Sequence, residues 1–144
     1  MKYILTIIAV ILTPFSMAAD TIEDAKTAFN KLVKYQKTDD ERSIDLFSKD
    51  CKVELTLTDG KRKQLAKIPT AAFLETIKKN IAEKKGNREK YEKIKFNKQD
   101  KGVLVTADIV YPDGKRGPFS ALYMPDGDGD LLIVELNITV YVDK

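Results

Sequence analysis

The sequence predicts an α+β domain, and three observations carry that prediction. Apolar residues recur at helical spacing near the N-terminus and again after residue 69. Apolar and polar residues alternate after residue 50 and over the later segments, which is typical of strands. Clusters of Gly, Pro and Asp separate these segments, as turns require. The sequence contains no internal repeat and no low-complexity linker.

Residues 1–18 have the features of a cleavable secretory signal. Lys2 is followed by a mostly apolar run over 4–12, which is far shorter than the roughly 20 residues that span a bilayer. Small residues at Ser16 and Ala18 favour cleavage after Ala18, with Ala19 as second choice. We therefore expect a periplasmic or secreted bacterial protein, cleaved near Ala18, and one domain over 19–144. An uncleaved anchor or an N-terminal helix is the alternative.

Two helices should open the domain. Residues 21–37 place an apolar stripe at helical spacing, namely Ile22, Ala25, Phe29, Leu32 and Val33. Asp39 or Asp40 can cap a short second helix that runs through Phe47, with Ile44 and Phe47 facing inward.

A strand, a hairpin and a third helix follow. Cys51, Val53, Leu55 and Leu57 alternate with polar residues, which predicts a strand with one buried face. Asp59-Gly60 favours a tight turn that returns the chain over 61–67. Pro69 and Thr70 should begin a helix that ends near Gly86.

Longer strands complete the chain. They are expected over 91–98, 103–111, 118–124 and 131–142, so the order is α-α-β-β-α-β-β-β-β. In the last strand, alternation assigns two faces. One carries Leu132, Val134, Leu136, Ile138, Val140 and Val142; the other carries Glu135, Asn137, Thr139 and Tyr141.

Composition excludes several kinds of site. The chain has no His, so His-dependent acid–base catalysis, triads and His metal sites are absent. The acidic run Asp126–Asp130 lacks the Gly and Glu of a calcium loop, because Leu131 and Asn137 occupy those positions. We therefore expect no metal and no cofactor. The neighbouring Val53, Leu55 and Leu57 predict that Cys51 occupies a buried strand position, with a reactive thiol as the alternative.

The charge of the chain does not identify a binding partner. Beyond Ala18 the formal net charge is +2, since Lys2 is removed from a chain of 25 basic and 22 acidic residues. The segment 78–101 is rich in Lys and Arg, which favours a solvated helix end and strand over a surface for an anionic partner. Trp is absent and aromatic residues are few in that segment, so no nucleic-acid partner is expected.

The element order, the stretch Ile44–Glu54 and the following Asp59-Gly60-Lys61 together resemble the nuclear transport factor 2-like superfamily. That superfamily includes ketosteroid isomerases, polyketide cyclases, scytalone dehydratase and small exported domains. The resemblance implies a cone, in which a curved mixed sheet wraps three helices and leaves a pocket. A cystatin-like fold is the alternative, although no Gln-x-Val-x-Gly segment is present.

The resemblance also locates the catalytic positions of the isomerase branch. Its general base falls on Leu55, which takes no proton. Its tyrosine donor falls on Lys31 or Leu32, and Tyr35 lies about one turn later. The known catalytic residues of the superfamily are therefore missing from this chain.

The remaining site candidates are carboxylates and tyrosines. Asp108 shares a strand face with Leu104, Thr106 and Val110, where burial would raise its pKa unless it lies on the outer face or pairs with a basic residue. The candidate catalytic residues are Asp108, Glu135 and Tyr35, with Tyr123 as a further donor. The candidate pocket-lining residues are Phe29, Leu55, Phe73, Tyr123, Asn137 and Tyr141.

The sequence thus favours a non-catalytic exported domain that binds a small apolar ligand or a protein partner, with homodimerisation through the sheet. The alternative is a small-molecule isomerase- or cyclase-type enzyme with a carboxylate and tyrosine site.

Overall fold

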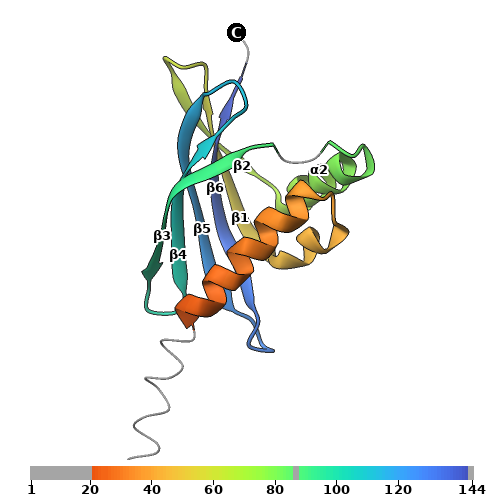
Figure 1. Cartoon of the computed structure of the whole chain (residues 1–144), viewed down its shortest axis with the longest axis vertical. Coiled ribbons are helices and arrows are strands. Elements are labelled where there is room, and N and C mark those ends of the chain that lie inside the picture. The colour runs from red at the N-terminus through yellow and green to blue at the C-terminus, as the bar shows by residue number, and fades with distance from the viewer. Residues whose placement is uncertain (1–20, 86–87, 143–144) are drawn as a thin grey trace, which may run out of the picture.

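The computed structural model describes residues 21–85 and 88–142 (Figure 1). The expected signal over 1–18 and the expected helix end at Gly86 lie outside these residues. The helices are a first helix over 21–37, the 3-10 helix η1 (Glu41–Leu46) and α2 (Thr70–Ala82). The strands are β1 (Phe47–Thr58), β2 (Lys63–Ile68), β3 (Lys90–Lys98), β4 (Val103–Val110), β5 (Arg116–Pro125) and β6 (Leu131–Tyr141).

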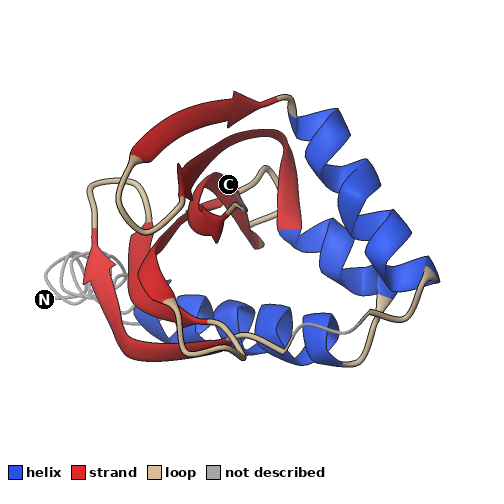
Figure 2. Cartoon of the chain, turned by 90° about the horizontal axis from the view of Figure 1, so that it is seen from above, coloured by secondary structure: helices blue, strands red, loops and turns tan. Residues whose placement is uncertain are grey.

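The strands form one mixed sheet in the order β2-β1-β6-β5-β4-β3. β1 and β6 pair in parallel, and the other neighbours are antiparallel. Seen from above, the sheet curves around one side of the molecule without closing, and the helices occupy the open side (Figure 2). The expected cone of a curved mixed sheet around three helices, and its element order, are confirmed.

Aromatic packing joins the first helix to the inner, helix-facing side of the sheet. Phe29 is buried, and its ring meets Tyr91 at 5.4 Å and Phe96 at 6.1 Å between centroids. Phe119 on β5 lies 6.1 Å from the same ring. Each such side chain removes a large apolar area from water and adds a favourable ring contact. This cluster fills the centre of the cone.

The second helix differs from its expectation. It is a 3-10 helix, and its buried residue is Ser43, while Ile44 is half-buried. Phe47 is the first residue of β1, and its ring packs edge-on against Phe73 of α2 at 5.4 Å. With only six residues between Asp40 and Phe47, the tighter 3-10 winding turns the chain directly into the strand.

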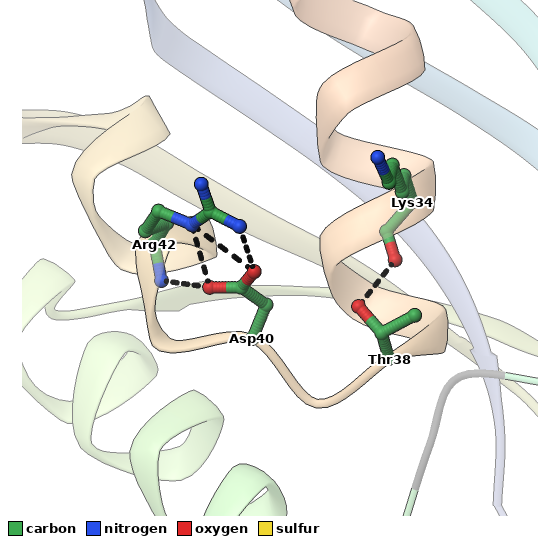
Figure 3. Close-up of polar contacts among 4 residues, drawn as sticks. All are labelled: Lys34, Thr38, Asp40 and Arg42. Atoms are coloured by element: carbon green, nitrogen blue, oxygen red, sulfur yellow. Dashed lines mark hydrogen bonds and ion pairs between the residues drawn. The ribbon is translucent and has the colours of Figure 1, made fainter.

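Asp40 caps η1, as one of the two expected residues (Figure 3). Its Oδ1 accepts from the Arg42 backbone N–H at 2.9 Å, and the Arg42 guanidinium reaches Oδ2 at 2.6 Å. These hydrogen bonds to Arg42 lower the pKa of the Asp40 carboxyl. Just before the cap, Thr38 Oγ1 donates to the Lys34 carbonyl at 2.9 Å. Side-chain hydrogen bonds thus fix the turn between the two helices.

The first hairpin forms as expected. Gly60 has φ +95°, the region that favours glycine. Asp59 Oδ1 accepts from the backbone N–H groups of Lys61 at 2.8 Å and Arg62 at 2.7 Å. β2 accordingly pairs antiparallel with β1.

The last strand corrects the expected alternation. Leu122 pairs with Glu135, whereas Tyr123 pairs with Ile133, so Val134 is an extra residue in β6. A bulge of this kind reverses the face of every residue before it. Ile133 is therefore fully buried, and Leu136 faces the core after the bulge. The expectation that Leu132 shares one face with Leu136 is wrong for this reason.

α2 ends at Ala82, four residues before the expected end, with Glu83 as its C-cap. Among residues 21–85 and 88–142, no helix has both the length and the hydropathy needed to cross a bilayer.

Candidate functional site: a groove on the outer face of the sheet

The side chains expected to line an interior pocket build the core instead. Phe29 and Tyr123 are buried to 1 % and 0 % exposure, and Leu55 and Phe73 pack against the same cluster. The Tyr123 hydroxyl finds no hydrogen-bond partner among the described residues, and burial raises its pKa. These four side chains therefore pack the core and are not available to a ligand.

Tyr35 is held by a neighbouring cation. The Arg42 guanidinium lies 4.6 Å from the centre of its ring, a cation–π distance. The same guanidinium is the one bound by Asp40 (Figure 3). Tyr35, Arg42 and Asp40 thus stabilise the turn into η1.

Asp108 lies on the outer face of the sheet, opposite the helices. Its neighbours Ala107 and Ile109 are buried in the core, whereas Asp108 is half-buried and paired in register with Glu92 and Pro118. Its Oδ2 lies 3.8 Å from the Lys93 Nζ. The structure therefore brings Asp108 to a basic residue and not to Tyr35 or Tyr123, which belong to the other side of the sheet.

Glu135 and Asn137 meet in a groove on this outer face. The groove has a volume of about 660 Å³, and its floor is formed by β1, β4, β5 and β6. Its border is the segment that joins β2 to α2, where the Thr70 hydroxyl donates to the Cys51 carbonyl. Strand residues with side chains on this face are Lys52, Glu54, Lys67, Leu104, Ser120, Leu122, Glu135 and Asn137.

Strand register arranges these side chains in two rows across the sheet. The first row runs Leu104, Leu122, Glu135 and Lys52. The second runs Thr106, Ser120, Asn137, Glu54 and Lys67. Each row therefore ends in an acidic residue beside a lysine, on adjacent strands.

Polar contacts fix the centre of the groove. The Asn137 amide donates to Glu54 Oε1 at 3.1 Å, and the Thr56 hydroxyl lies 3.4 Å from Asn137 Oδ1. Below the floor, burial raises the pKa of the Cys51 thiol to about 11, and Glu135 adds to that shift. The thiol is consequently neutral and poorly nucleophilic at pH 7.

The two halves of the outer face differ in how their carboxylates are paired, since lysines without an ion pair, such as Lys95, also occur on the β3–β5 half. On the β3–β5 half, Asp108 faces Lys93, and Glu92 binds Arg116 at 2.5 Å. In the groove half, Lys52, Lys67 and Glu135 form no ion pair within 4 Å with any residue that the structure describes. The groove therefore presents charged groups of both signs that the chain itself does not neutralise.

Tyr141 lies beyond the groove, at the far end of β6. Its hydroxyl donates to the Arg116 carbonyl at 2.8 Å, and its ring meets Tyr111 at 6.1 Å. Of the expected site residues, only Glu135 and Asn137 lie in the groove.

Lys52, Glu54 and Lys67 were missing from the sequence candidates. The alternation over 51–58 already places Lys52 and Glu54 on the face opposite Cys51 and Val53. What alternation does not supply is the neighbour of β1, and its parallel pairing with β6 brings Glu54 to Asn137.

Comparison with known proteins supports the fold. Neither the comparison with protein-family models nor the one with curated proteins finds a match. Among solved structures, a protein assigned as the beta subunit of an aromatic-ring-hydroxylating dioxygenase from Novosphingobium aromaticivorans has a TM-score of 0.58 at 14% identity. That match covers 89% of this chain and 94% of the other.

Two further similar structures have the same TM-score of 0.58. One is assigned as a dehydratase of the nuclear transport factor 2-like family from Streptomyces avermitilis, at 12% identity, covering 85% of this chain and 98% of that one. The other is a nuclear transport factor 2-like protein of unknown function from Silicibacter pomeroyi, at 10% identity, covering 83% and 94%. At these identities the likeness concerns architecture alone. The chain has the nuclear transport factor 2-like fold.

Proposed function

We propose that this chain is an exported, non-catalytic interaction domain, and that the groove on its outer sheet face binds a second copy of the chain. The observation that carries the proposal is that the groove combines lysines and a carboxylate that form no ion pair with the described residues, whereas the carboxylates Asp108 and Glu92 of the other half are paired. Charged side chains that the chain leaves unpaired are available to a partner, and a protein interface can satisfy them.

The arrangement of charge favours a second copy over an unrelated partner. A two-fold interface brings one surface patch against itself, so the patch must be self-complementary. The row containing Lys52 and Glu135 meets that condition, because a two-fold axis between these residues places each lysine opposite the partner's glutamate. Leu104 and Leu122 extend the same row and would add apolar contact.

The position of the carboxylates weighs against the enzyme alternative. Asp108 and Glu135 lie on the outer face, and Tyr35 and Tyr123 lie on the helix side. A carboxylate and tyrosine pair must converge on one substrate to act as base and donor. Export rests on the features of residues 1–18.

Sedimentation velocity on the full chain, expressed in a bacterium and purified from its periplasm, tests the proposal. The mass of the product should correspond to a chain that begins at Ala19, and the protein should sediment as a dimer. Lys52→Glu places four like charges at the interface and should weaken dimerisation by about tenfold or more. Lys61→Glu makes the same charge change in the exposed turn and should leave the dimer intact. A monomer at every concentration, or equal loss in both variants, would contradict the proposal.

A further inference from the structure

Strand β3 forms one edge of the sheet and bends partway along its length. It is last in the strand order, so β4 is its one neighbour among the described strands. The register shifts between Glu92 and Lys95, where Lys93 and Ile94 together oppose the single residue Ala107 of β4. Lys93 has φ +53°, in the left-handed region that residues other than glycine rarely adopt. A bulge of this kind bends a strand, and Figure 1 shows β3 changing direction along its length.

The bulge leaves an apolar side chain exposed to solvent. Ile94 is 41 % exposed and is one of three large apolar residues that are exposed in the described part of the chain. The aromatic residues of the same strand, Tyr91 and Phe96, instead pack against Phe29 on the inner side of the sheet. Exposed lysines flank Ile94 on both sides. The bend therefore presents one apolar group between two cations.

This edge of the sheet carries an excess of positive charge. The basic residues of β3 and of the turn that follows it are all exposed, namely Lys90, Lys93, Lys95, Lys98 and Lys101. Of these five, only Lys93 forms an ion pair with a described residue, and its Nζ lies 3.8 Å from Asp108 Oδ2. The acidic residues of the same stretch are Asp100 and Glu92, and Glu92 binds Arg116. Most of the lysine charge is therefore left for a partner.

Protection of the sheet edge explains only part of this arrangement. Bulges and lysines on an edge strand prevent that strand from pairing with another chain, and β3 has both. An exposed isoleucine does not serve that purpose, because an apolar side chain at an open edge favours association. Ile94 and its lysines together suit a partner that accepts an apolar group and carries negative charge.

The kinds of side chain narrow the class of that partner. Protein interfaces are enriched in arginine and depleted in lysine, and the unpaired cations of this edge are lysines. The aromatic residues of β3 face the core, so the strand offers no surface on which nucleic-acid bases could stack. A membrane of anionic lipid fits both observations, because its phosphates attract flexible lysines and its interface accepts an apolar side chain.

We propose that the β3 edge binds the surface of a membrane that contains anionic lipid. Ile94 enters the headgroup region, and the five lysines named above bind lipid phosphates around it. No β3 residue lines the groove, so this surface is separate from the interface proposed above. The bulge and the exposure of Ile94 are what the structure adds to the basic composition of 78–101.

Co-sedimentation of the full chain with lipid vesicles tests the proposal. Vesicles of phosphatidylglycerol and phosphatidylcholine in equal parts should bind the protein at least tenfold more tightly than vesicles of phosphatidylcholine alone. The difference should shrink as the salt concentration is raised. Lys95→Gln combined with Lys98→Gln should weaken binding to the mixed vesicles at least tenfold, because each lysine near such a surface contributes about fivefold. Ile94→Ser should weaken it about threefold or more.

Matched variants at the opposite edge of the sheet provide the control. Lys61→Gln combined with Lys63→Gln removes the same charge from the β1–β2 hairpin, and Leu65→Ser removes an apolar side chain that is 64 % exposed. Both should leave vesicle binding unchanged. Because all the variants share one N-terminus, differences between them report on the two edges alone.

Four outcomes would overturn the proposal. The first three are no stronger binding to the anionic vesicles, equal losses in the β3 variants and their controls, and unchanged binding in Ile94→Ser. The fourth is duplex DNA binding as tightly as the mixed vesicles, which would make the edge a general surface for polyanions. Sedimentation velocity of every variant without lipid should match the unsubstituted chain, which separates failure here from failure of the interface.

Discussion

The two faces of one sheet differ in nearly every physical property. The inner face carries Val105, Ala121 and Tyr123 at 0 % exposure and packs against Phe29. The outer face carries Thr106, Ser120 and Asn137 in a row that ends in Glu54 and Lys67. The side chains of the inner face are buried in the core, whereas the outer face carries polar side chains that do not belong to the core. The outer face therefore offers more groups to a partner than the centre of the cone does.

The largest expected loss of stability comes from removing a buried side chain on the inner side of the sheet. Phe29→Ala should lower the free energy of unfolding by about 3–5 kcal/mol, because it removes a buried ring and leaves a cavity among aromatic neighbours. Leu65→Ala is the matched control on the outer face, where Leu65 is 64 % exposed, and it should change stability by about 0.5 kcal/mol or less. Urea denaturation measures both. Similar losses in the two variants would refute the contrast between the faces.

Two Tyr→Phe substitutions should have smaller effects on stability, and these effects should have opposite signs. Tyr123→Phe removes a buried hydroxyl that has no partner among the described residues, so stability should rise by about 1 kcal/mol. Tyr141→Phe removes a hydroxyl that donates to the Arg116 carbonyl, so stability should fall by about 0.5 kcal/mol. If Tyr123→Phe instead destabilises the protein, its hydroxyl has a partner in the folded state.

The sequence predicts most of the fold, because the relevant signals are local. Helical spacing locates the first helix, alternation locates β1, and Asp59-Gly60 locates the first hairpin. The face of Ile133 escapes prediction because the bulge at Val134 depends on pairing with β5. The 3-10 form of η1 escapes it because Asp40 caps either kind of helix.

The sites are harder to predict, because they depend on contacts between distant segments. Glu135 and Asn137 stand out in the sequence, yet their groove neighbours Glu54 and Lys67 enter through the parallel pairing of β1 with β6 and the antiparallel pairing with β2.

The most direct test of the central claim, that the outer face binds a second copy, is a mixing experiment with two charge-swapped chains. Lys52→Glu makes the groove more acidic and Glu135→Lys makes it more basic, so like charges should weaken the dimer of each variant alone by about tenfold or more. In an equimolar mixture, the opposite charges should restore dimerisation in sedimentation velocity. Dimers of either variant alone as strong as those of the unsubstituted chain, or no gain in dimerisation in the mixture, would contradict the account.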